Sequence, residues 1–212
     1  FGSHRVIMLI GFVSVWSQLR SRKAEMPRLF VILSGEVMDV FDKLVAIYSK
    51  IREVNDMLQE REGVSYEQVS SLLQAVGLHV DPLLLRMYEF RNGIDNLSAF
   101  LNFLSAEEAV QRYKDFANFK AEFSDFEWSE GVLPILDING DVQVCVDLAS
   151  GKLVTVDIEC DSNRVIAPHY SAYVDALYEV FAAGHFKYDP ASGSIELDDT
   201  LWRDVANRYG II

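Results

Sequence analysis

The residues of this chain best suited to chemistry are its acids, and the clearest group is Asp137-Ile-Asn139-Gly-Asp141. Oxygen ligands at alternate positions are how a calcium-binding loop begins. Such a loop would continue with a glycine and end on a bidentate acid, but Val142 and Leu148 stand at those positions. An Asn-Gly pair between two apolar runs is instead a strong signal for a β-hairpin. The segment therefore predicts a tight turn rather than a calcium site.

Three more acids, Asp147, Asp157 and Glu159, fall on neighbouring predicted strands. If they converged, two of them could act as a general acid and a general base. Acids at strand ends in a chain this acidic are usually solvated, so an unrecognised hydrolase is the weakest of the functional hypotheses.

Histidine and cysteine positions give no support for a metal site. Neither residue type shows metal-ligand spacing. The residues are His4, His79, His169, His185, Cys145 and Cys160. Both cysteines lie in apolar, strand-like runs, where we expect buried, reduced thiols in a cytoplasmic protein. Nucleophile-elbow, dinucleotide-binding and phosphate-loop motifs are also missing from the sequence. We therefore predict a non-enzymatic protein with no cofactor and no metal.

The charge balance indicates what kind of partner the chain would take. Nineteen basic and 32 acidic residues give a net charge of −13 and a pI near 4.7. The first 30 residues carry five basic residues and one acid, a balance of +4, so the other 182 hold −17. An acidic surface repels nucleic acid and anionic membranes. It favours a basic protein partner.

Residues 1–35 do not match the rest of the chain. Their apolar stretch, Val6 to Trp16, is too short to span a membrane, and no signal-peptide cleavage site follows it. We expect residues 1–35 to be an extension or an artefact, and residues 36–212 to form a single domain. Half of the residues are hydrophobic, which is enough for a sizeable core.

A clean helical pattern runs from Glu36 to Glu60. Its apolar residues, Val37 to Leu58, alternate at spacings of three and four and form one seam. A seam of three heptads could pair two copies of the chain in a short coiled coil. The alternative is a helix packed on its own domain, which the wider stripe made by Phe41 and Tyr48 favours.

The remaining pattern predicts an α+β fold. Ser65, Asp81 and Ser105 are expected to cap three helices, and Pro168 and Thr200 to begin two more. Expected strands cover residues 132–138, 142–148 and 153–159, with a terminal hairpin at 186–188 and 194–197. We predict a central antiparallel sheet, made of this meander plus the terminal hairpin, flanked by helices.

The order of these motifs resembles the SUKH superfamily, which includes the fungal Smi/Knr cell-wall regulators. The resemblance covers about residues 65–200. The matching blocks are Leu73–Gly93, Ser105–Ala109, Leu133–Gly140 with Val144–Leu148 and Gly151–Val154, and Tyr170–Phe181 followed by Gly184. The family usually has a Trp or Gly-Gly near the central hairpin, whereas Trp128 stands earlier here.

The resemblance implies a protein-binding role. Bacterial members look like immunity proteins that neutralise a cognate toxin, often a nuclease or deaminase, and fungal members are regulatory interaction modules. An acidic immunity protein would complement the basic cleft of a nuclease toxin. The candidate contact residues are exposed acids and aromatics near the sheet, namely Glu127, Trp128, Asp147, Asp157 and Glu159. A regulatory or scaffolding module of the same fold is the alternative.

Overall fold

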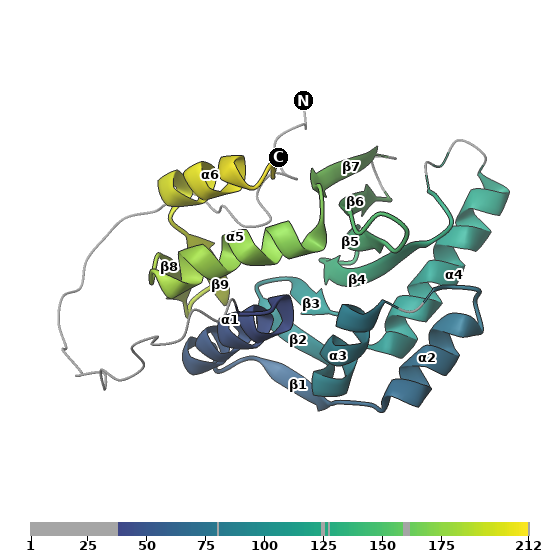
Figure 1. Cartoon of the computed structure of the whole chain (residues 1–212), viewed down its shortest axis with the longest axis horizontal. Helices are drawn as coiled ribbons and strands as arrows, with labels where there is room; N and C mark the ends of the chain where they lie inside the picture. Colours follow the sequence, from purple (N-terminus) through teal and green to yellow (C-terminus); the bar gives the residue numbers. More distant parts are fainter. Residues whose placement is uncertain (1–37, 80, 124–125, 127, 159–161, 212) are drawn as a thin grey trace.

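A seven-stranded antiparallel sheet lies at the centre of the computed structural model, and its strands follow one another in chain order (Figure 1). The structure describes residues 38–211 except 80, 124–125, 127 and 159–161. The predicted boundary at residue 35 and the segment before it therefore lie outside the described residues. The strands are β1 (Gln59–Glu62), β2 (Arg91–Ser98), β3 (Leu101–Phe103), β4 (Val132–Ile138), β5 (Val142–Asp147), β6 (Leu153–Asp157) and β7 (Ser162–Ala167).

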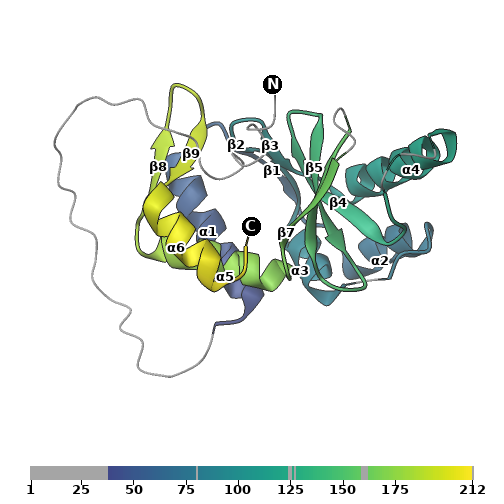
Figure 2. The same cartoon turned by 90° about the horizontal axis from the view of Figure 1, so that it is seen from above.

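Helices cover both faces of this sheet (Figure 2). The helices are α1 (Val40–Val54), α2 (Tyr66–Gln74), α3 (Pro82–Phe90), α4 (Ala106–Glu122), α5 (Tyr170–Ala182) and α6 (Asp199–Arg208). Helix α4 packs against β4 on one face, with α2 beside it, while α1 and α5 pack together on the other face. The terminal hairpin of β8 (Phe186–Asp189) and β9 (Ser194–Leu197) forms a small sheet of its own. The predicted α+β class is confirmed, whereas the prediction that the terminal hairpin belongs to the central sheet is wrong, because β8 and β9 pair only with each other.

The central hairpin follows the sequence prediction closely. Strand β4 has the predicted bounds, and the turn residues Asn139 and Gly140 have φ values of 54° and 83°. Both values lie in the left-handed region, which Asn and Gly tolerate best. Cys145 on β5 is fully buried, and burial raises the pKa of its thiol. Cys160 lies outside the described residues.

Predicted caps begin α2, α3 and α4. Ser65 and Ser105 both form complete capping boxes, and the Asp81 carboxylate accepts hydrogen bonds from the first turn of α3. The last two helices begin differently from the prediction. His169 rather than Pro168 precedes α5, and Asp198 caps α6 in place of Thr200, because its carboxylate accepts from two backbone N–H groups.

Helix α1 is shorter than the predicted helix over residues 36–60. It ends at Val54 because Asn55 is buried and turns its side chain to tertiary partners. Its amide donates to the Asn96 carbonyl at 2.7 Å and accepts from the Tyr188 hydroxyl at 3.1 Å. The centre of the predicted seam, including Ile47 and Ile51, is buried within the chain. These side chains therefore pack on their own domain.

No helix among the described residues is both long enough and apolar enough to cross a membrane.

Candidate functional site

Trp128 is buried, so the expectation of an exposed aromatic contact there is wrong. Only 8% of its surface is accessible. The indole packs on α4, with its ring centre 5.0 Å from Tyr113 and 6.4 Å from Phe116, both in edge-on geometry. Aromatic rings gain more from such packing than from exposure to water. Trp128 holds α4 to the loop before β4 and offers no partner surface.

Asp147 is a turn residue at the end of β5. Its carboxylate accepts from the Ala149 N–H at 3.0 Å and from the Ser150 hydroxyl at 2.5 Å. The Ser150 hydroxyl is the main reason that the pKa of this carboxyl lies below its ordinary value. The half-buried side chain closes the β5–β6 turn, and these hydrogen bonds explain why an aspartate stands at this position.

Asp157 lies at the opposite end of the sheet from Asp147. It pairs with Val142, the first residue of β5, whereas Asp147 is the last. Five residues of strand separate the two positions by roughly 17 Å. Asp157 is also only 5% exposed. The expected convergence of these two acids, and the expected exposure of Asp157, are therefore wrong. Glu127 and Glu159 lie outside the described residues.

Phe100, which the sequence analysis did not single out, is the most exposed large hydrophobic residue that the structure describes. Its exposed fraction is 69%. It occupies the two-residue turn between β2 and β3, because Ser98 pairs with Leu101. Its φ is 61°, a conformation that costs an ordinary side chain about 1–2 kcal/mol. Strained backbone of this kind clusters at functional sites.

The β4–β5 turn lies directly beside Phe100. The Asn139 N–H donates to the Phe100 carbonyl at 2.9 Å, and Leu101 pairs with Ile138. Asn139, Gly140 and Asp141 are all exposed. The two turns thus form one surface at the end of the sheet. We call it the Phe100 tip, and its residues are Ala99, Phe100, Asn139, Gly140 and Asp141.

Hydrogen bonds behind the tip hold its shape. The Asp137 carboxylate accepts from the Gly140 N–H at 3.2 Å and from the side-chain amide of Gln143. The Arg112 guanidinium approaches the same carboxylate at 3.8 Å. The Ile158 N–H donates to the Asp141 carbonyl at 3.2 Å. The tip is therefore an exposed aromatic ring on a braced backbone, with the exposed acid Asp141 next to it.

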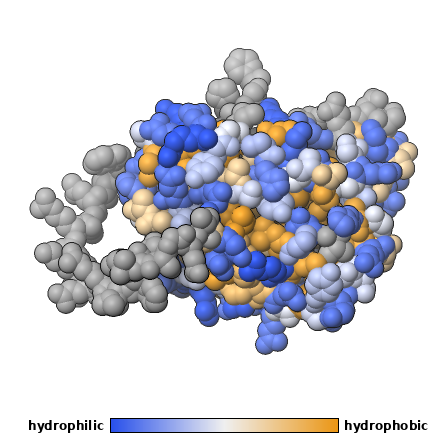
Figure 3. Space-filling model, in the orientation of Figure 1, coloured by the Kyte–Doolittle hydropathy of each residue, from blue (hydrophilic) through white to orange (hydrophobic). Residues whose placement is uncertain are grey.

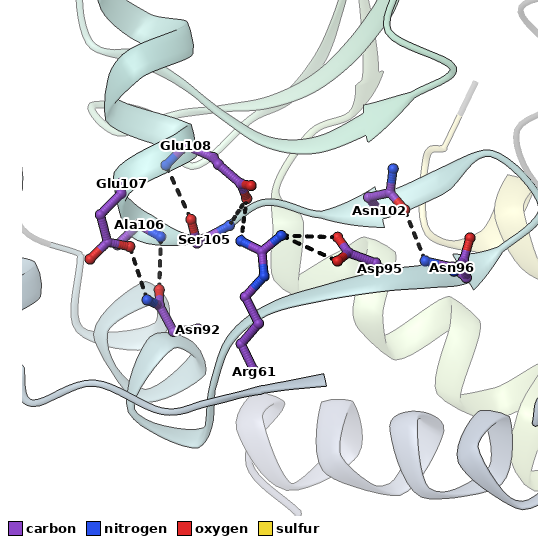
Figure 4. A network of polar contacts seen from close by, with 9 residues as sticks. All are labelled: Arg61, Asn92, Asp95, Asn96, Asn102, Ser105, Ala106, Glu107 and Glu108. Atoms are coloured by element: carbon purple, nitrogen blue, oxygen red, sulfur yellow. Dashed lines mark hydrogen bonds and ion pairs between the residues drawn. The ribbon is translucent and has the colours of Figure 1, made fainter. Parts of the chain in front are cut away.

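A second polar cluster has a structural role (Figure 4). Arg61 on β1 bridges the Asp95 carboxylate on β2 and the Glu108 carboxylate on α4, at 3.2 and 2.9 Å. Glu108 also accepts from the Ser105 N–H at 2.8 Å, and Ser105 accepts from the Glu108 N–H. These bonds tie the first turn of α4 to the first two strands.

The Asn92-Gly93 pair completes this connection. The side-chain oxygen of Asn92 accepts from the Ala106 N–H at 2.8 Å, and the side-chain NH₂ of Asn92 donates to the Glu107 carboxylate at 2.9 Å (Figure 4). Gly93 has a φ of 102°, and a Cβ there would lie 3.1 Å from the backbone nitrogen of Ser105. The Asn92-Gly93 pair, which ends the first SUKH-like block, thus holds the start of α4 against β2.

The Arg61 cluster predicts an acid-sensitive fold. Burial alone would raise the pKa of Glu108, but hydrogen bonds from the Ser105 N–H and Arg61 outweigh it and hold the pKa below 4.5, its ordinary value. The unfolded chain therefore binds a proton more readily in acid, so this contribution to stability is present above about pH 5 and lost below it.

We expect the urea midpoint of unfolding to fall between about pH 5 and pH 3, and Glu108→Gln to flatten part of that fall. Urea titrations from neutral to acid pH measure both. Glu130→Gln, at an exposed position, is the matched control. Equal pH profiles for wild type and Glu108→Gln would contradict the assignment.

No protein-family model matches this chain, and a search of curated proteins finds no match. The SUKH assignment consequently stays a prediction from the order of the motifs. Among the described residues, no group of three or more His, Cys, Asp or Glu side chains is placed to hold a metal ion.

A partly open apolar cavity of about 240 Å³ lies between the sheet and the helices α1, α3 and α5. Figure 3 shows apolar side chains reaching the surface near the middle of this face, between α1 and α3.

Proposed function

We propose that this protein is a non-enzymatic protein-binding domain of the immunity type, which neutralises a basic toxin domain by occupying its surface. The observation that carries the proposal is Phe100, a large aromatic side chain 69% exposed at a strained φ of 61°. Aromatic residues dominate the energetics of protein interfaces. A bulky residue held in such a conformation, with few contacts of its own, is best explained by a partner.

Charge supports the same proposal. The 182 residues after the first 30 hold a net charge of −17, and Asp141 stands exposed beside Phe100. Such a surface attracts a basic protein and raises its association rate. Nuclease toxins bind phosphate and carry basic clefts, which makes them a fitting class of partner. The SUKH-like order of motifs leads to the same class of proteins.

The proposal is tested by capture from a lysate of the source cells with the full chain as bait. The bait and the proteins bound to it are washed at about 0.05 M and about 0.5 M salt, because exposed charges are screened at the higher concentration. We expect one basic protein, retained near 1:1 at low salt and largely released at high salt. Mass spectrometry identifies it, and its own activity is then assayed with and without the chain.

Several weak partners with no common charge would contradict a dedicated inhibitor and favour a regulatory or scaffolding module. Turnover of a substrate by the purified chain, lost in Asp147→Asn, would instead favour the hydrolase hypothesis. Asp147 lies in the β5–β6 turn, far from the Phe100 tip, so that variant leaves the proposed binding surface unchanged.

A further inference from the structure

The cavity between the sheet and the helices has walls that are almost entirely apolar. Leucine, isoleucine, valine and aromatic side chains line it from α1, α3, α5, β9 and six strands of the central sheet. Natural interiors are close-packed and contain few voids larger than a water molecule. Water is a poor occupant, because a buried water needs two to four polar partners. An apolar cavity of about 240 Å³ is therefore a site for an apolar occupant.

The volume indicates the size of that occupant. An engineered cavity of about 150 Å³ in another protein stays dry and binds benzene, which corresponds to about 25 Å³ per carbon atom. On that scale, 240 Å³ accommodates about ten carbon atoms. A fused pair of aromatic rings or a medium-length alkyl chain has this size.

The polar groups at the wall indicate that the occupant is uncharged. Among the residues that the structure describes, Arg91 is the only charged one in the lining, and its guanidinium already donates to Glu60 at 2.9 Å and to the Phe90 carbonyl at 2.6 Å. Tyr48 on α1 also lines the cavity, and its buried hydroxyl forms no hydrogen bond with a described residue. It can donate one hydrogen bond to a ligand oxygen.

We propose that this cavity binds a neutral hydrophobic small molecule of about ten carbon atoms, with a single oxygen atom that accepts a hydrogen bond from Tyr48. The chain's own apolar segment, Val6 to Trp16, is a poorer occupant, because the cavity has room for only about two large side chains. The site is independent of the proposed partner binding, since Phe100 does not line the cavity.

The test uses 1-decanol as the probe and decanoate as its charged counterpart, added to the full chain. Calorimetric titration and melting temperature measure binding. We expect 1-decanol to bind near 1:1 and to raise the melting temperature, and decanoate to bind at least about tenfold more weakly. Tyr48→Phe should weaken 1-decanol binding but leave the binding of decane unchanged. Absence of 1-decanol binding, or equal binding of decanoate, would overturn the proposal.

Two substitutions on α5 test whether the space is an unfilled cavity or a packed part of the core. Val174 lines the cavity, whereas Val180 is fully buried and does not. Val174→Phe should fill the space, raise the melting temperature of the free protein and reduce 1-decanol binding at least about tenfold. Val180→Phe should lower the melting temperature, because it overpacks a filled site. Unchanged 1-decanol binding by Val174→Phe would contradict the assignment.

One variant tests whether the chain's own amino-terminal apolar stretch occupies the cavity. Leu9→Asp with Ile10→Asp makes the amino-terminal apolar stretch polar within the full chain. We expect this variant to bind 1-decanol as the wild type does. Binding by the variant alone would mean that this segment fills the cavity, and would overturn the small-molecule proposal.

Discussion

Gly63→Ala is expected to lower the free energy of unfolding by about 3 kcal/mol or more, because an added Cβ approaches its neighbours more closely there than at any other described glycine. An ideal Cβ at Gly63 would lie 1.8 Å from the Glu89 carbonyl oxygen and 2.5 Å from its carbon. Both are backbone atoms, so no side chain can rotate away. Hydrogen bonding fixes the approach, because the Val64 N–H donates to the Tyr88 carbonyl at 3.1 Å.

Chemical denaturation of the purified variant measures this loss, and Gly77→Ala is the matched control. A Cβ at Gly77 meets nothing within 4 Å, but its φ of 75° disfavours alanine. We expect the control to lose only about 1 kcal/mol. Equal losses for the two variants would contradict a steric clash between a Cβ at Gly63 and the backbone of α3.

Phe100→Asn is expected to weaken partner binding at least about thirtyfold while leaving the protein as stable as the wild type or up to about 1 kcal/mol more stable. Asparagine tolerates positive φ well, so the substitution relieves strain at Phe100. It removes few internal contacts, because the ring is 69% exposed. Titration with the captured partner and denaturant unfolding of the same samples measure the two effects.

Tyr66→Asn is the control that tests whether loss of any exposed aromatic side chain weakens partner binding. Tyr66 is 49% exposed and begins α2, and it is not part of the Phe100 tip. We expect unchanged partner binding in this variant. A Phe100→Asn protein that binds normally, or that loses stability by 1 kcal/mol or more, would remove Phe100 from the proposed interface.

Local signals in the sequence were sufficient for much of the fold. Asn139-Gly140 predicted the central hairpin because only residues that tolerate positive φ suit such a turn. Ser65, Asp81 and Ser105 predicted helix starts because capping is a local interaction of side chain with backbone. These elements stand where the sequence placed them.

The first three strands and β7 were not predicted from the sequence. Strand β1 reads Gln-Glu-Arg-Glu and β2 begins Arg-Asn-Gly, so neither shows the alternation of apolar and polar residues that signals a strand. Their positions depend on long-range contacts such as the bridge from Arg61 to Asp95 and Glu108. Residues 36–60 were predicted to be wholly helical because the buried contacts of Asn55 are tertiary and have no local signature.

The candidate site was the least predictable part for a related reason. Exposure depends on the whole fold, and Trp128, an aromatic in a polar loop, is buried on α4. Phe100 gave no signal because the strands on either side of it were not predicted. With β2 and β3 in place, Ala99 and Phe100 form a two-residue turn, whose residues usually lie at the surface.

The most direct test of the account is a stoichiometric inhibition titration with the captured basic partner. Increasing amounts of the full chain are added to a fixed amount of that partner, and the partner's residual activity is measured at low salt. We expect activity to fall in proportion and to reach its minimum at one equivalent of wild-type chain, with the Phe100→Asn chain requiring a large excess. Partner activity that stays unchanged at every ratio would contradict the immunity-type function.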